Sequence, residues 1–257
     1  LKERRKMAKA YWNENGRWLC GGPEDFFGTA DGMPPGKMIS FVGGGGKTST
    51  MFYLAEVYSR RGLKTAVMTT TKIRRTEVFC NAPEQWEKLW AEGKYAVCGE
   101  AADETKLRSM EKESVDILAA SADVVLIEAD GAGTRPCKAP APYEPVILPE
   151  CDVVVGVMGL DAAGRPVSEV CFRKEIVCGR LGCGQDHLLT CDDMAELMTR
   201  ADCMKKDVGG RRFFAVYNKC DDEERFETGR ILCRMTEERG VHAVLTCMKP
   251  GGEWLRP

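Results

Sequence analysis

The stretch KMISFVGGGGKTSTMFYLAEVYSRRG, residues 37–62, decides the fold of this chain. It joins a short apolar run, 38–42, to an amphipathic run, 47–61, through four consecutive glycines. In a βαβ unit, such a strand ends at the carboxyl edge of a sheet, where the next helix presents unpaired amides and the positive end of its dipole. Glycines permit positive φ values and let backbone amides approach phosphate oxygens closely. The stretch therefore predicts a phosphate-binding loop.

The loop residues have expected roles in holding a nucleoside triphosphate. The amides expected to surround the phosphates belong to Gly43, Gly44, Gly45 and Gly46. Lys47 is expected to reach the β and γ phosphates, the Thr48 hydroxyl to bind Mg²⁺, and Ser49 to contact the α phosphate. The spacing, G-x-x-G-K-T, is shorter than the usual G-x-x-x-x-G-K-[ST] and resembles the loop of Mur-type ligases. A plain glycine-rich turn with a solvent-facing lysine is the alternative interpretation.

The rest of the chain alternates strand-like with helix-like segments. Strands are expected at 38–42, 64–68, 123–127, 153–158, 213–217 and 242–246, with a weaker one at 94–98. Helices are expected at 47–61, 83–92, 104–120 and 192–200. Apolar strands without alternation are buried on both faces, as in a parallel sheet. The predicted fold is α/β, P-loop NTPase-like and doubly wound, with a mainly parallel sheet and helices on both faces.

The first 36 residues show no sustained periodicity and contain many glycines and prolines. We predict an N-terminal appendage, 1–36, attached to a P-loop nucleotide-binding domain, 37–257. Trp12 and Trp18 are candidates for docking this appendage on the domain.

Charge and composition exclude several classes of protein. The 257 residues contain 37 Lys and Arg against 39 Asp and Glu, so no overall field attracts nucleic acid or an anionic membrane. The longest apolar runs have strand length, which is too short to span a bilayer. Thirteen scattered cysteines without C-x-x-C pairs indicate reduced thiols. We expect a soluble, cytoplasmic protein that binds neither nucleic acid nor membrane.

Four soft metal ligands lie close together in the sequence, at Cys178, Cys183, His187 and Cys191. Zinc binds such ligands in a tetrahedron. Their spacing matches no common zinc module, and Thr190 with Asp193 predicts a capping box that begins a helix. Ordinary thiols are the favoured interpretation.

The segment VVLIEADGAGTRP, residues 124–136, contains the expected metal ligands. Glu128 and Asp130 follow an apolar strand beside the phosphate loop, where a carboxylate binds Mg²⁺ directly or through water. Both are expected to face one side, because side chains alternate along a strand. Residues 130–133 also read D-x-x-G, the pattern with which switch-type hydrolases sense the γ phosphate. Thr70 is expected to complete the metal shell, with plain β-propensity as the alternative.

The segment FFAVYNKCDDEE, residues 213–224, ends a buried strand with the pattern N-K-x-D. Asp221 is expected to accept hydrogen bonds from guanine N1 and N2, Asn218 to contact N7, and Lys219 to lie over the ring. Adenine lacks this pair of donors, so a buried carboxylate facing it would be unpaired. The pattern favours GTP over ATP and leaves both open.

The order of these segments resembles one known family. The stretches SFVGGGGKTS, VMTTTKI, LIEADGAGTRPCKAPAPYEPVI, VVVGVMGLDAAGRPV, FRKEIV and VYNKCD are together similar to the YqeC family, over about residues 38–224. The resemblance implies a P-loop fold and a role in making or inserting a selenium-containing cofactor, with a client molybdenum hydroxylase or a selenium-delivery protein as partner. The chain departs from the family at Phe172 and Lys72, where histidines are common, while Arg173 is retained.

A stiff basic loop follows the acidic strand, at residues 135–145. Arg135 and Lys138 lie among four prolines near the expected γ phosphate. They are candidates to neutralise charge in phosphoryl transfer, or to bind an anionic second substrate such as a selenophosphate-like or pterin phosphate group. A solvated basic loop is the alternative. Cys137 is a candidate selenium carrier, and Asp161 is expected at the same edge of the sheet.

Three functions are compatible with these motifs. The first is an NTP-hydrolysing maturation factor, in which loop movement coupled to the phosphates drives delivery of selenium or cofactor to a client. The second is a small-molecule kinase or an NTP-dependent ligase, which the short loop suggests. The third is a nucleotide-binding sensor without turnover.

Overall fold

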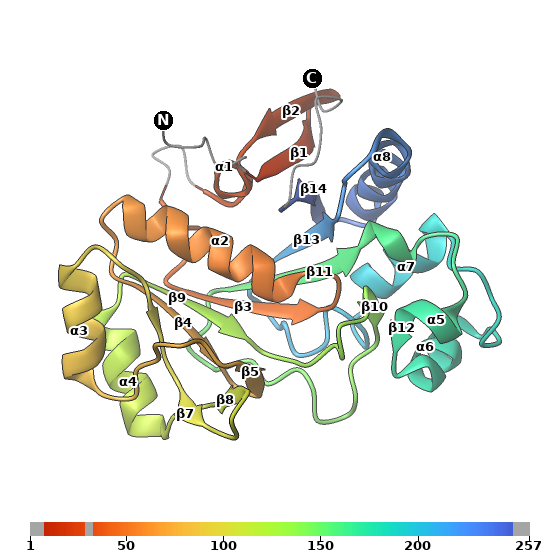
Figure 1. The fold of residues 1–257 in the computed structure, drawn as a ribbon. Helices are drawn as coiled ribbons and strands as arrows, with labels where there is room; N and C mark the ends of the chain where they lie inside the picture. Colours follow the sequence, from red (N-terminus) through yellow and green to blue (C-terminus); the bar gives the residue numbers. More distant parts are fainter. Residues whose placement is uncertain (1–7, 29–32, 249–257) are drawn as a thin grey trace.

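The computed structural model describes residues 8–28 and 33–248, and it is built around one large twisted sheet (Figure 1). Its nine strands follow the order β2-β1-β14-β13-β11-β3-β9-β4-β6. The strands from β14 to β6 all pair in parallel. They are β3 (Met38–Gly43), β4 (Thr65–Thr69), β6 (Ala96–Val97), β9 (Val124–Glu128), β11 (Val153–Gly159), β13 (Arg212–Asn218) and β14 (His242–Cys247).

Strand β3 lies in the middle of this sheet, between β9 and β11. The chain first builds the sheet on one side of β3, through β4 and β9, and then on the other side, through β11, β13 and β14. A doubly wound sheet binds its ligand where the direction of winding reverses, at the carboxyl ends of the strands. The topology therefore points to the turn that follows β3.

Helices cover both faces of the sheet (Figure 1). One face packs against α2 (Lys47–Arg60) and α1 (Pro23–Phe27). The other packs against α3 (Pro83–Ala91), α4 (Lys112–Ser121), α7 (Cys191–Thr199) and α8 (Glu223–Glu238). The predicted α/β class, with a mainly parallel sheet and helices on both faces, is confirmed and is consistent with a P-loop-like fold. None of the helices in the described residues has the length and apolar character needed to cross a bilayer.

The N-terminal segment forms a hairpin that the sequence analysis did not assign. Strands β1 (Lys9–Glu14) and β2 (Arg17–Gly21) join through Asn15 and Gly16, whose φ values are 53° and 85°. An Asn-Gly pair with both φ values positive is the favoured two-residue hairpin turn, so the signal was present in the sequence. Strand β1 pairs antiparallel with β14 and extends the sheet.

Aromatic side chains attach this segment to the rest of the chain. The ring of Phe27 in α1 lies edge-on to Phe214 of β13, with centroids 5.7 Å apart. The ring of Trp18 packs against that of Phe226 in α8, with centroids 5.9 Å apart, which agrees with the expected docking of Trp18 on the domain. Trp12 lies against Phe26 within the segment. Residues 1–7 and 29–32 of the predicted appendage lie outside the described residues, and the domain boundary at residue 36 stays a prediction.

The expected helix at 104–120 is wrong in its first part, because α4 begins at Lys112. Residues 106–108 instead form β8, in a small antiparallel sheet with β5 (Lys72–Arg74) and β7 (Glu100–Ala101). Leu107 is buried while Lys106 and Arg108 are exposed, so this stretch has the period of a strand. The remaining short elements are β10 (Cys137–Lys138), β12 (Cys171–Phe172), α5 (Val167–Val170), α6 (Lys174–Leu181) and a 3₁₀ turn, Leu160–Ala162.

We predict that the N-terminal segment contributes to the stability of the sheet. Phe27 is 3% exposed, so Phe27→Ala is expected to lower the free energy of unfolding by about 3–5 kcal/mol. The control is Ile231→Ala, at a side chain that is 54% exposed, and it is expected to change stability by less than about 0.5 kcal/mol. Urea denaturation measures both, and equal small effects would show that the segment is not part of the core.

Candidate functional site

The turn between β3 and α2 packs main chain directly against main chain. Gly43, Gly45 and Gly46 have φ values of +96°, +72° and +132°. A Cβ atom on Gly45 would lie 2.1 Å from the nitrogen of Gly159, and one on Gly46 would lie 2.1 Å from Nδ2 of Asn218. A larger residue fits neither the backbone angles nor the space. The glycine run is therefore required by the geometry of the turn.

The amides of this turn fall into two groups. Three donate inside the protein, from Gly43 to Asp130 Oδ2 at 2.9 Å, from Gly44 to the Val157 carbonyl at 2.8 Å and from Gly45 to the Arg135 carbonyl at 3.0 Å. The amides of residues 46–49 have no acceptor among the described residues, and the first helical bond runs from Thr50 to the Gly46 carbonyl. Of the four glycine amides expected to surround phosphates, those of Gly43, Gly44 and Gly45 are therefore already occupied, and only that of Gly46 has no acceptor among the described residues.

These amides border a cavity of about 390 Å³. Five cationic residues line it together with Glu128, and they are Lys47, Lys72, Lys106, Arg135 and Lys219. A chain of net charge −2 thus concentrates positive charge at one place, which suits a polyanion. Sequence reasoning missed Lys106, for which no signal exists, and noted Lys72 only as a departure from the family. The basic run Lys72-Ile73-Arg74-Arg75 was the available signal for Lys72.

Thr48 and Glu128 meet at the wall of this cavity. The Thr48 hydroxyl donates to Oε2 of Glu128 at 2.8 Å. Burial raises the pKa of Glu128, and the neighbouring Lys47 ammonium and the Thr48 hydrogen bond oppose that rise. A hydroxyl and a carboxylate are oxygen ligands of the kind that Mg²⁺ accepts, so this pair fits a magnesium site. Thr70 does not join it, because its hydroxyl donates to the Val146 carbonyl at 2.7 Å.

Asp130 lies behind the turn and does not line the cavity. Its carboxylate accepts the Gly43 amide and pairs with two buried ammonium groups, those of Lys47 and Lys138, each at 3.0 Å. The Lys47 ammonium also donates to the Gly43 carbonyl. Strand β9 ends at Glu128, so strand alternation does not fix the direction of the Asp130 side chain, and the expectation that both carboxylates face one side stays a prediction.

Two expectations for the basic loop also need correction. Lys138 is fully buried, and its ammonium lies 2.7 Å from Oε2 of Glu144 as well as against Asp130, so it cannot reach an anion in the cavity. Cys137 is also fully buried, and a hydrogen bond with Cys171 together with burial raises its pKa well above the usual range. The thiolate needed for a selenium carrier is therefore disfavoured. Arg135 does line the cavity, with its guanidinium donating to the Glu169 carbonyl.

The N-K-x-D residues surround a second cavity, of about 200 Å³, that adjoins the turn. Nδ2 of Asn218 donates to the Gly45 carbonyl at 2.8 Å, and this amide nitrogen has a second N–H. The Lys219 ammonium pairs with Asp161 at 2.6 Å. The Asp221 carboxylate is 41% exposed and pairs with Arg225 at 3.2 Å. The structure therefore brings the motif to the turn, with Asp221 accessible from solvent.

The four soft ligands of the candidate zinc cluster divide into smaller contacts: Cys178 and Cys183 hydrogen-bond each other, and the Cys191 thiol lies 4.0 Å from the Thr228 carbonyl. His187 contacts Oδ2 of Asp193 at 2.7 Å. Thr190 and Asp193 form the predicted capping box of α7, which is confirmed. Within residues 8–28 and 33–248, no three His, Cys, Asp or Glu side chains are arranged to share a metal ion.

We predict that Gly45 is required for more than its backbone angle. Gly45→Ala is expected to destabilise the protein by clearly more than Gly62→Ala, although the φ values, +72° and +85°, are similar. Nothing lies within 4 Å of a Cβ on Gly62, so that variant carries only the strain of a left-handed residue, about 1–2 kcal/mol. Denaturant unfolding of both variants measures the difference, and equal losses would contradict the close approach to Gly159.

We also predict a pH dependence caused by Glu128. A carboxyl whose pKa is raised on folding contributes stability below its unfolded pKa, and this contribution is lost as pH rises through the folded pKa. The free energy of unfolding of the wild type, relative to Glu128→Gln, is therefore expected to fall as pH rises from 4.5. Urea denaturation over a pH series checks this. For the control Glu227→Gln, at an exposed site, the difference from the wild type should not change with pH. If the free energies of unfolding of the wild type and Glu128→Gln change with pH in parallel, the prediction is contradicted.

Comparison with known proteins places the chain in a family. The family model described as YqeC protein matches residues 39–175. The chain is also 31% identical to the "Uncharacterized protein YqeC" of Escherichia coli (strain K12) over 199 residues, which cover 72% of this chain and 78% of that protein. The matched family segment contains the glycine turn, the Thr48–Glu128 pair and the Asp130 cluster. The chain belongs to the YqeC family.

Proposed function

We propose that this protein binds a nucleoside triphosphate with Mg²⁺ at the N-terminus of α2 and hydrolyses it. The observation that carries the proposal is the set of backbone amides at residues 46–49, which have no acceptor in the described part of the chain and border a cavity lined by five cationic residues. A helix N-terminus of this kind favours phosphate through both its amides and its dipole.

The Lys47 ammonium would have to move from Asp130 to the phosphates when a nucleotide binds. Its ammonium now pairs with Asp130, 3.0 Å away, and lies at 4% exposure beneath the turn. When phosphates occupy the cavity, their charge competes with the carboxylate for this ammonium. Asp130 would then retain its bonds to Lys138 and the Gly43 amide, so it would not become an unpaired buried charge. Phosphate binding is therefore coupled to a change at Asp130.

The magnesium ion would be held by Thr48 and Glu128, and when bound it would neutralise charge on the β and γ phosphates. Glu128 must be ionised for this role, and its ionisation is favoured by the nearby Lys47 ammonium. Arg135 also lines this cavity, and its guanidinium would have to leave the Glu169 carbonyl to stabilise charge on the transferred group. Thr70 and Lys138 have no direct role in this proposal.

The base of the nucleotide would lie in the cavity beside Asp221. A guanine there would exchange the Arg225 contact for hydrogen bonds from its own N1 and N2 donors. Asn218 holds the adjacent turn in place through the Gly45 carbonyl. We therefore propose GTP as the preferred nucleotide, with ATP as the alternative.

The family resemblance supports a biological setting for this activity. We propose an accessory role in the maturation of a selenium-dependent molybdenum hydroxylase, with the client enzyme or a selenium-delivery protein as partner. Movement at Asp130 on phosphate binding would supply the conformational change that drives delivery of selenium or cofactor to the client. A second candidate is group transfer to a small molecule, which is favoured by a larger cavity that shares Thr48 with the phosphate cavity.

Calorimetric titration with GTP and ATP, each with and without Mg²⁺, tests the proposal. The wild type is expected to bind GTP more tightly than ATP. High-affinity binding is expected only when Mg²⁺ is present. Lys47→Ala is expected to lose detectable binding, because it removes the cation that reaches the β and γ phosphates. Asp221→Ala is expected to keep binding while losing the preference for guanine.

The matched control is Lys94→Ala, since this exposed lysine pairs with Glu92 and lies outside the phosphate cavity. It is expected to bind nucleotide as the wild type does. An unchanged base preference in Asp221→Ala would overturn the guanine assignment. Failure of the folded wild type to bind either nucleotide would overturn the proposed function itself.

A further inference from the structure

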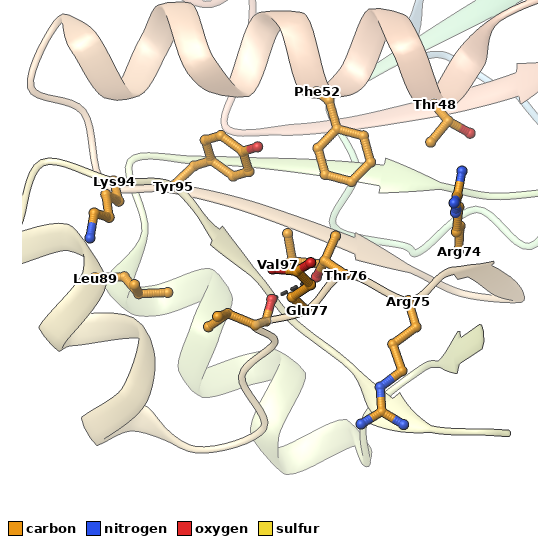
Figure 2. A pocket seen from close by; sticks show the side chains of 11 residues that line it. Thr48, Phe52, Arg74, Arg75, Thr76, Glu77, Leu89, Lys94, Tyr95 and Val97 are labelled. Atoms are coloured by element: carbon orange, nitrogen blue, oxygen red, sulfur yellow. Dashed lines mark hydrogen bonds between the residues drawn. The ribbon is translucent and has the colours of Figure 1, made fainter. Parts of the chain in front are cut away.

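A larger cavity, of about 720 Å³, lies beside the phosphate cavity (Figure 2). It runs along α2 from Thr48 to Phe52, and its opposite wall is formed by residues 74–78 and by Tyr95 and Val97. The Thr76 hydroxyl donates to the Val78 carbonyl at 2.6 Å and braces that wall. Thr48 lines both cavities, so they meet at the first turn of the helix.

Two aromatic rings form the apolar part of this cavity. The rings of Phe52 and Tyr95 lie with centroids 6.0 Å apart and planes inclined by 54°. Both side chains are half-buried and face the cavity in Figure 2. Val97 and Leu89 extend the apolar lining. Rings arranged in this way offer stacking and edge contacts to a planar group.

The cations around this cavity differ in what they contact. Arg75 is directed away from the cavity and lies over the Phe79 ring, 4.8 Å from its centroid. Lys94 pairs with Glu92 at 2.7 Å. The Arg74 guanidinium, in contrast, has no hydrogen-bond or ion-pair partner within the described residues, and Figure 2 shows it directed towards the Thr48 end. An unpaired guanidinium there can hold a carboxylate or phosphate in a bidentate contact.

We infer that this cavity binds a second small-molecule ligand with a planar aromatic body and an anionic group. The ligand's ring would pack against the cavity-facing sides of Phe52 and Tyr95, and the anion would contact Arg74 next to Thr48. The Arg74 guanidinium, which is directed towards the Thr48 end of the cavity, is the group that would attract an anion there. That this ligand is a co-substrate of the nucleotide rests on the proposed function, whereas its binding does not.

Three probes of one shape test the inference without nucleotide: 1-naphthyl phosphate, 1-naphthoate and neutral 1-naphthol. Fluorescence titration is expected to show that the anions bind about tenfold more tightly than naphthol, and that Arg74→Ala removes this advantage. Phe52→Ala is expected to weaken all three probes by about three- to tenfold. Comparison of the affinities for 1-naphthyl phosphate and 1-naphthoate shows which anion the site prefers. Thermal unfolding of each variant confirms that it is folded.

The matched control is Arg75→Ala, which changes the neighbouring residue of the same type and is expected to leave all three affinities unchanged. Saturating Mg²⁺ and GTP should leave the probes bound, because the two cavities share only Thr48. Equal effects at Arg74 and Arg75, no binding of any probe at millimolar concentration, or displacement by nucleotide would each overturn the inference. Probe binding together with a failure to bind nucleotide would overturn only the proposed function.

Discussion

The candidate site depends on one buried carboxylate, that of Asp130. It accepts the amide of Gly43 and pairs with the ammonium groups of Lys47 and Lys138, and all four groups lie out of contact with solvent. A buried carboxylate is costly unless it is paired and hydrogen-bonded, so these contacts must form together. They tie the Gly43 end of the turn and Lys47 to the segment that follows β9. Residues 46–49, at the start of α2, line the cavity.

The winding of the sheet separates the two halves of the site. Strand β9, on one side of β3, ends at Glu128, and β13, on the other side, ends at Asn218, shortly before Asp221. The glycine turn lies between them because β3 is central. The second-ligand cavity lies on the β4 and β6 side, near Thr48 and away from Asp221. The proposed nucleotide and the proposed second ligand would therefore occupy different cavities.

The sequence predicted the parallel strands well, because short apolar runs such as 124–127 and 153–157 are typical of strands that are buried on both faces of a sheet. It failed where tertiary context decides. Leu107 is a strand residue only because β5 and β7 lie beside it. Lys138 resembles a loop cation in sequence, but Asp130 and Glu144 bury it. The hairpin at Asn15 and Gly16 was predictable from its turn residues, whereas the contribution of Lys106 to the cavity depends on long-range pairing that the sequence does not encode locally.

NMR spectroscopy of the amide groups tests most directly whether the backbone amides at the start of α2 bind phosphate. Addition of a non-hydrolysable GTP analogue with Mg²⁺ to ¹⁵N-labelled protein is predicted to shift the amide resonances of residues 46–49 and to slow their hydrogen exchange. The amides of Gly62 and Gly240, in open turns, should remain unchanged. Unchanged resonances at residues 46–49 under saturating analogue would contradict the account.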